Sequence, residues 1–83
     1  MKETEQSSDY EILGPSEVQS YDTVTYYVYN GIGSWILPAA APIDIISQTT
    51  NELKIEIKPI RNKTTFTLGY GEKELQITVK PFK

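Results

Sequence analysis

The stretch Leu53-Lys54-Ile55-Glu56-Ile57-Lys58 sets the interpretation of the whole sequence, because apolar and charged residues alternate in it without a break. A period of two places the three aliphatic side chains on one face of an extended strand and the three charged ones on the other. The aliphatic face predicts contact with a core, and the charged face predicts solvated cross-strand pairing. We therefore expect this segment to be a half-buried β-strand.

Runs of the same kind lie on both sides of this stretch, separated by Gly, Pro, Asn and Ser, and no helical period interrupts them. Such punctuation is typical of short strands. We expect strands at residues 10–13, 22–29, 35–37, 43–47, 53–58, 65–70 and 75–80, with a further short piece at 17–19. The other side chains predicted to face inward are Val24, Tyr26, Val28, Phe66, Leu68, Leu75, Ile77 and Val79, with Trp35 at the centre of the core.

About seven short strands, each with one apolar face, predict an all-β fold of two antiparallel sheets packed face to face, an immunoglobulin-like sandwich. The connection at Asn30-Gly31 is ambiguous, because this dipeptide favours a tight hairpin between neighbouring strands. In an immunoglobulin sandwich the equivalent connection crosses between the sheets. The extra residues Ile32-Gly33-Ser34 give the chain length for that crossing, and both alternatives stay open.

The length of 83 residues fits one domain and is short for two. Residues 1–8 are polar and charged apart from Met1, which predicts a flexible tail or linker, and residues 9–83 are expected to form the domain. The longest weakly polar stretch, residues 35–46, is too short to cross a bilayer, so no membrane insertion is expected. We expect the domain to belong to a larger protein or assembly.

Cysteine and histidine are both absent, which removes disulfides, thiolate chemistry and the commonest general base and metal ligand. The acidic residues lack the spacing of a calcium loop and form no carboxylate pair of the kind a glycosidase needs. The sequence therefore predicts no catalytic residue, no cofactor and no metal site. A net charge of −3 argues against a phosphate-binding surface, so nucleic acid is not an expected partner.

Several short motifs follow one another in a recognisable order. They are Gly14-Pro15-Ser16-Glu17-Val18, Tyr21, Thr25-Tyr26, Gly33-Ser34-Trp35, Thr65-Phe66-Thr67-Leu68 and Leu75-Gln76-Ile77-Thr78-Val79. In this order the chain resembles bacterial and phage immunoglobulin-like domains from Ile12 to Lys80, without the cysteine pair of antibody domains. The resemblance implies a module of a virion or of an extracellular cell-surface protein that spaces, decorates or binds weakly to polymers or neighbouring proteins. It implies no catalytic residues.

Two surfaces are candidates for binding. Tyr27 and Tyr29 share the face opposite the inward valines, where aromatic rings can stack on a sugar or anchor a protein, although tyrosine is also a common strand residue. An uncharged loop is the second surface, and it can either dock onto a neighbour or simply cap the core. Its residues are Pro38, Ala39, Ala40, Ala41 and Pro42.

These surfaces lead to two functional hypotheses, neither of them enzymatic. The first is a structural or adhesive module of a phage particle or bacterial surface protein, with a protein or a cell-surface glycan as partner. The alternative is a dedicated carbohydrate-binding domain. That alternative requires the rings of Tyr27 and Tyr29 to be exposed, coplanar and close to a polar side chain that can bind sugar hydroxyls.

Overall fold

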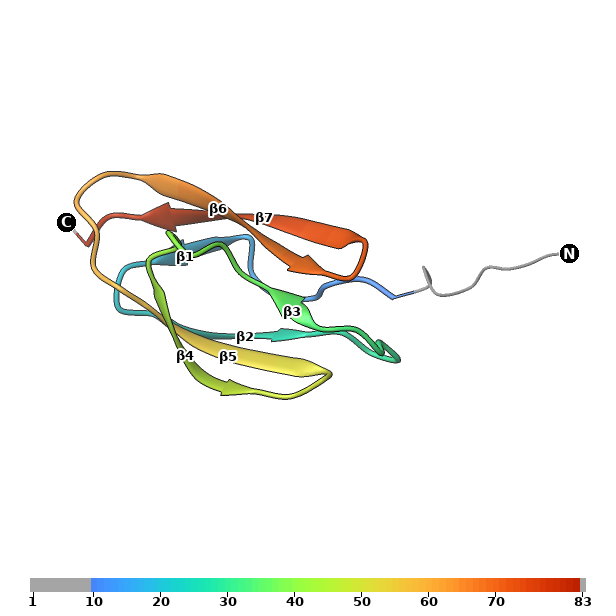
Figure 1. Cartoon of the computed structure of the whole chain (residues 1–83). Coiled ribbons are helices and arrows are strands. Elements are labelled where there is room, and N and C mark those ends of the chain that lie inside the picture. Colours follow the sequence, from blue (N-terminus) through green and yellow to red (C-terminus); the bar gives the residue numbers. More distant parts are fainter. Residues whose placement is uncertain (1–9, 83) are drawn as a thin grey trace, which may run out of the picture.

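A computed structural model of the protein describes residues 10–82, and the expected tail at residues 1–8 lies outside that range. The strands are β1 (Glu17–Gln19), β2 (Thr23–Tyr27), β3 (Trp35–Ile36), β4 (Ile43–Gln48), β5 (Glu52–Ile57), β6 (Thr64–Tyr70) and β7 (Lys73–Lys80). They form a four-stranded sheet in the order β1-β7-β6-β3 and a three-stranded sheet in the order β2-β5-β4. The two sheets lie face to face in a sandwich-like arrangement (Figure 1).

The alternating segment at residues 53–58 corresponds to β5, the middle strand of the three-stranded sheet, which pairs antiparallel with β2 and β4. Its three aliphatic side chains are buried, and Lys54 and Glu56 are exposed. The all-β prediction is confirmed. No part of residues 10–82 forms a helix long and apolar enough to cross a membrane.

The core lies between the sheets and contains twelve buried hydrophobic residues. They are Val18, Tyr26, Val28, Trp35, Leu53, Ile55, Ile57, Phe66, Leu68, Tyr70, Ile77 and Val79. Trp35 is buried as expected but lies on β3, an edge strand, where its Nε1 donates a hydrogen bond to the Thr49 carbonyl at 2.8 Å. The largest fully enclosed side chains are instead Tyr26 and Tyr70, so the aromatic centre of the core is shared between the two sheets.

Three details of the topology differ from what local patterns favour. β1 and β7 pair in parallel, so the prediction of wholly antiparallel sheets was wrong for this pair. The expected strand at residues 10–13 is reduced to one bridge between Leu13 and Tyr27, because the chain then passes to the other sheet and forms β1. Asn30-Gly31 does not close a hairpin, since β2 and β3 lie in different sheets.

Tyr70 explains why the chain crosses between sheets at Asn30-Gly31. Its hydroxyl accepts a hydrogen bond from the Gly33 N–H at 2.9 Å and donates one to the Thr50 carbonyl at 2.8 Å. A Cβ on Gly31 would come within 2.7 Å of that hydroxyl, so this position needs glycine for space. Asn30 takes the left-handed conformation of the turn, with φ at 65°. The loop is thus shaped around a buried tyrosine.

We predict that Tyr70→Phe lowers the free energy of unfolding by about 1–3 kcal/mol, because it leaves polar backbone groups without their buried partner. Urea titration monitored by tryptophan fluorescence measures this change. Tyr29→Phe is the control, since the Tyr29 side chain is exposed and its substitution should change stability by less than about 0.5 kcal/mol. Equal effects of the two substitutions would contradict the role assigned to the Tyr70 hydroxyl.

The other enclosed tyrosine, Tyr26 on β2, donates its hydroxyl proton to the Pro15 carbonyl at 2.6 Å. Burial raises the pKa of Tyr26 from 10.0 to about 12, because the ionised phenolate is poorly solvated in the core. In the unfolded chain the same group ionises near its ordinary pKa. The stability that comes from protonated Tyr26 is therefore fully present below pH 10.0 and is lost as the pH rises towards about 12.

We predict that Tyr26→Phe is less stable than the wild type near neutral pH by about 0.5–1.5 kcal/mol, the contribution of one hydrogen bond. This difference should shrink above pH 10 at up to about 1.4 kcal/mol per pH unit, because only the wild type loses the contribution of this proton. Urea titrations of both proteins at increasing pH measure this difference. The other tyrosines are present in both proteins, so the effects of their ionisation cancel when the two free energies are subtracted. A constant difference through the alkaline range would contradict the raised pKa.

Candidate functional site

The uncharged loop predicted to bind a partner connects β3 to β4 and so passes from one sheet to the other. β3 stops at Ile36, and Pro38 and Pro42 have no N–H with which to continue a ladder. The loop is held by a turn in which the Ala41 N–H donates to the Pro38 carbonyl at 3.1 Å. The Pro42 carbonyl in turn accepts a hydrogen bond from the Lys58 N–H at 2.8 Å.

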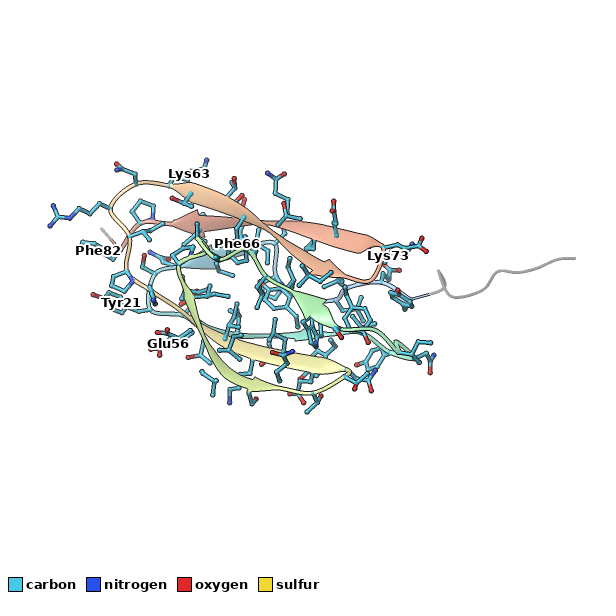
Figure 2. The ribbon with its side chains drawn as sticks, in the orientation of Figure 1. Tyr21, Glu56, Lys63, Phe66, Lys73 and Phe82 are labelled. Atoms are coloured by element: carbon cyan, nitrogen blue, oxygen red, sulfur yellow. The ribbon has the colours of Figure 1, made fainter. Side chains whose placement is uncertain are left out.

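A groove of about 530 Å³ lies between this loop and β6, and we refer to it as the β6 groove. It is lined by Ile36, Leu37, Pro38, Ala40, Ala41, Pro42, Thr64, Thr65, Phe66, Thr67, Gly69, Gly71 and Glu74. Figure 2 labels Phe66 on β6, next to the chain that leaves β3. Glu74 is the only charged residue in the lining, so the groove is a largely apolar depression.

The loop has both of the roles that the sequence left open. Four of its five candidate residues line the β6 groove, while Ala39 is exposed and lies outside it. Ala41 and the preceding Leu37 also pack against the core. The loop therefore covers the edge of the core on one side and forms a wall of the groove on the other.

β6 contributes the other wall, and its backbone there has no partner. β7 pairs with every residue of β6, whereas β3 pairs only with Gly69 and Tyr70 on the opposite edge. Along that edge, residues 64–68 have no backbone hydrogen-bond partner within residues 10–82. This half of the site was not predicted from the sequence, because the threonines of β6 are typical of an ordinary solvent-exposed strand face.

The second predicted surface, Tyr27 and Tyr29, is exposed. The two side chains are 39% and 63% accessible, their ring centroids are 6.2 Å apart and their planes differ by 16°. Glu52 is the direct cross-strand partner of Tyr27, which places its carboxylate on the same face of the sheet. The rings are thus accessible and close to a hydrogen-bonding side chain, but they lie in stacked, nearly parallel planes and not in the single plane of a coplanar pair.

Other exposed hydrophobic residues were not predicted. Ile32 is 88% accessible in the β2–β3 loop, and its position between Gly31 and Gly33, outside any strand, was the available signal. Tyr21 and Phe82 form an aromatic pair with centroids 6.4 Å apart at the end of the domain opposite the β6–β7 turn (Figure 2). No sequence pattern connects these two residues, because they meet only in the folded chain.

The charged residues of the described chain lie mainly on solvated faces. Lys58 and Asp44 are 3.6 Å apart and Lys80 and Glu17 are 3.4 Å apart, and all four side chains are more than half exposed. Exposed pairs of this kind contribute about 0–1 kcal/mol. Within residues 10–82, no three His, Cys, Asp or Glu side chains come together as metal ligands would.

No family model matches the chain, and no curated protein or solved structure is significantly similar to it. Function is therefore inferred from the geometry of the chain itself.

Proposed function

We propose that this protein is a non-catalytic, immunoglobulin-like module of a phage particle or bacterial surface protein, which attaches to a protein partner through the β6 groove. The strand order supports this. The sheets β2-β5-β4 and β3-β6-β7 correspond to the B-E-D and C-F-G strands of an immunoglobulin domain. The bridge at Leu13 beside β2, followed by β1 beside β7, corresponds to a first strand divided between the two sheets.

The apolar lining of the β6 groove is the observation that carries the attachment role. On a chain with a net charge of −3, thirteen residues with one carboxylate among them form a continuous concave surface. Its volume of about 530 Å³ lies within the range of pockets that hold ligands. When a partner covers apolar, uncharged surface of this kind, the water that contacted it is released, and this favours association.

The same lining supports a non-catalytic role. General acid–base or nucleophilic catalysis needs a positioned pair of reactive groups, and the β6 groove offers a single carboxylate, Glu74, with threonines and aliphatic side chains. The apolar lining also favours a polypeptide over a glycan as the occupant of this groove. Sugar binding generally uses exposed aromatic faces together with several polar groups, and Phe66, the only aromatic residue of the lining, is buried.

We predict that Ala40→Arg strongly weakens attachment, because a long charged side chain would occupy the apolar groove. Flow cytometry of bacterial cells and pull-down of purified phage particles with the labelled protein measure attachment, with an expected loss of about tenfold or more, equivalent to about 1.4 kcal/mol. Ala39→Arg is a matched control, since Ala39 is also exposed but lies outside the groove. Attachment that survives Ala40→Arg, or no attachment by the wild type, would contradict the proposal.

Carbohydrate binding at Tyr27 and Tyr29 is the second candidate, favoured by the exposure and near-parallel orientation of their rings. We predict that, if this face binds a glycan, Tyr27→Ala and Tyr29→Ala each weaken binding on a glycan array by roughly two- to tenfold, the effect of one lost aromatic contact. Tyr21→Ala, which removes an exposed tyrosine from another surface, should bind as the wild type does. Glycan binding unaffected by all three substitutions would exclude this face as the site.

A further inference from the structure

The unpaired edge of β6 lacks the protective features that the open edges of β1 and β4 carry. Natural edge strands are commonly short, bulged, charged or covered, so that they do not pair with other chains. The outer edge of β4 is interrupted by a bulge between Ile45 and Ser47, and β1 is only three residues long and begins with Glu17. In contrast, residues 64–68 of β6 form a regular, uncharged ladder against β7 with their other edge open.

The sequence keeps its own chain from closing this edge. Continuation of β3 beyond Ile36 would place residues 37–41 beside residues 64–68 of β6, and the second of those positions is Pro38. Pro38 cannot donate to a ladder, and the chain instead turns away to β4. The space left between the loop and β6 is the β6 groove, so the open hydrogen-bonding edge and the apolar groove are one site.

The shape and chemistry of this site fit a single extended segment. An added strand would pair with the N–H and C=O groups that alternate residues of 64–68 direct away from β7, and it would contact Pro38, Ala40 and Pro42 on its other side. Its alternate side chains would point towards the rim near Leu37 and outward over Ile36. Because the lining holds only one charge, the segment that fits best is uncharged, with small or β-branched side chains.

From these observations we propose that the β6 groove binds an extended, uncharged segment of another polypeptide as an added strand beside β6. The inference rests on the proposed attachment function and specifies how the partner is held. The chain's own residues 1–9 do not match the groove, since four of the nine are charged and only Met1 is apolar. A folded second copy would have to fit the strands behind its own edge past residues 38–42, which form the other wall of the groove, whereas a single extended segment has no such strands.

The test is an NMR titration of the ¹⁵N-labelled protein with a capped peptide of alternating threonine and valine. Main-chain hydrogen bonds supply the affinity in strand addition, so this generic sequence is a sufficient probe. We expect shifts confined to residues 64–68 and the loop, and amide exchange at that edge slowed by about tenfold or more at saturation. The same peptide methylated on every backbone nitrogen cannot donate from either edge and should bind about tenfold more weakly or worse.

Ala40→Arg should weaken peptide binding by about tenfold or more, and Ala39→Arg should leave it unchanged. The methylated peptide keeps the test decisive on the wild-type protein even where a variant is unstable. Absence of shifts at residues 64–68, or equal binding of both peptides, would overturn strand addition. Shifts that grow with protein concentration alone, with a dimer in sedimentation equilibrium, would identify a second copy as the occupant and overturn the proposal as stated.

Two results separate this inference from the proposed function. Attachment to cells or phage particles that is lost in Ala40→Arg, combined with no peptide binding at β6, would retain the groove as the attachment site and reject strand addition. Peptide binding at β6 without any attachment by the wild-type protein would retain strand addition and reject the proposed attachment to those targets.

Discussion

The hydroxyl of Tyr70 is the contact on which the rest of this domain depends. Tyr70 belongs to β6 in the four-stranded sheet, and its hydroxyl donates to the carbonyl of Thr50 in the connection between β4 and β5 of the other sheet. The same oxygen accepts the Gly33 N–H from the β2–β3 loop. The described chain has no disulfide, so one buried phenol ties together the sheets and a crossing loop. The aromatic rings of Tyr10 and Trp35 pack edge-on around it.

The β6 groove follows from how this end of the domain is built. Once the loop has been fixed by Tyr70, β3 begins at Trp35 and pairs with only the last two residues of β6. The prolines that follow then direct the chain to the other sheet. A longer β3 would bury more surface and satisfy more backbone groups, which would favour stability. The short β3 instead leaves both the apolar lining and the open edge accessible in one place, which is what recognition of another chain requires.

Local alternation in the sequence was enough to predict most strands and their faces. The inward positions of β5, β6 and β7 follow from side-chain period alone, because each of these strands has one face in the core. Pairing between distant segments could not be predicted in this way. The parallel pairing of β1 with β7 and the crossing at Asn30-Gly31 depend on contacts far apart along the chain. The loop at residues 38–42 was predicted from its composition. The open edge of β6 depends on the absence of a neighbouring strand, and the residues of β6 do not indicate whether such a neighbour exists.

The parallel pairing of β1 and β7 also determines how the domain would carry mechanical load. The two ends of the described chain lie at opposite ends of the sandwich, with Tyr10 beside Gly71 of the β6–β7 turn and Phe82 beside Tyr21, so a pull on them acts along its length (Figure 1). Because the strands are parallel, that force would slide β1 along β7 and strain all of their hydrogen bonds at once, whereas a hairpin pulled from its open end gives way one bond at a time. Bonds from Ser20 to the Lys80 carbonyl and from Thr78 to the Ser16 carbonyl extend this connection at both ends. Under tension applied at the two ends, this pair would therefore resist as a shear clamp.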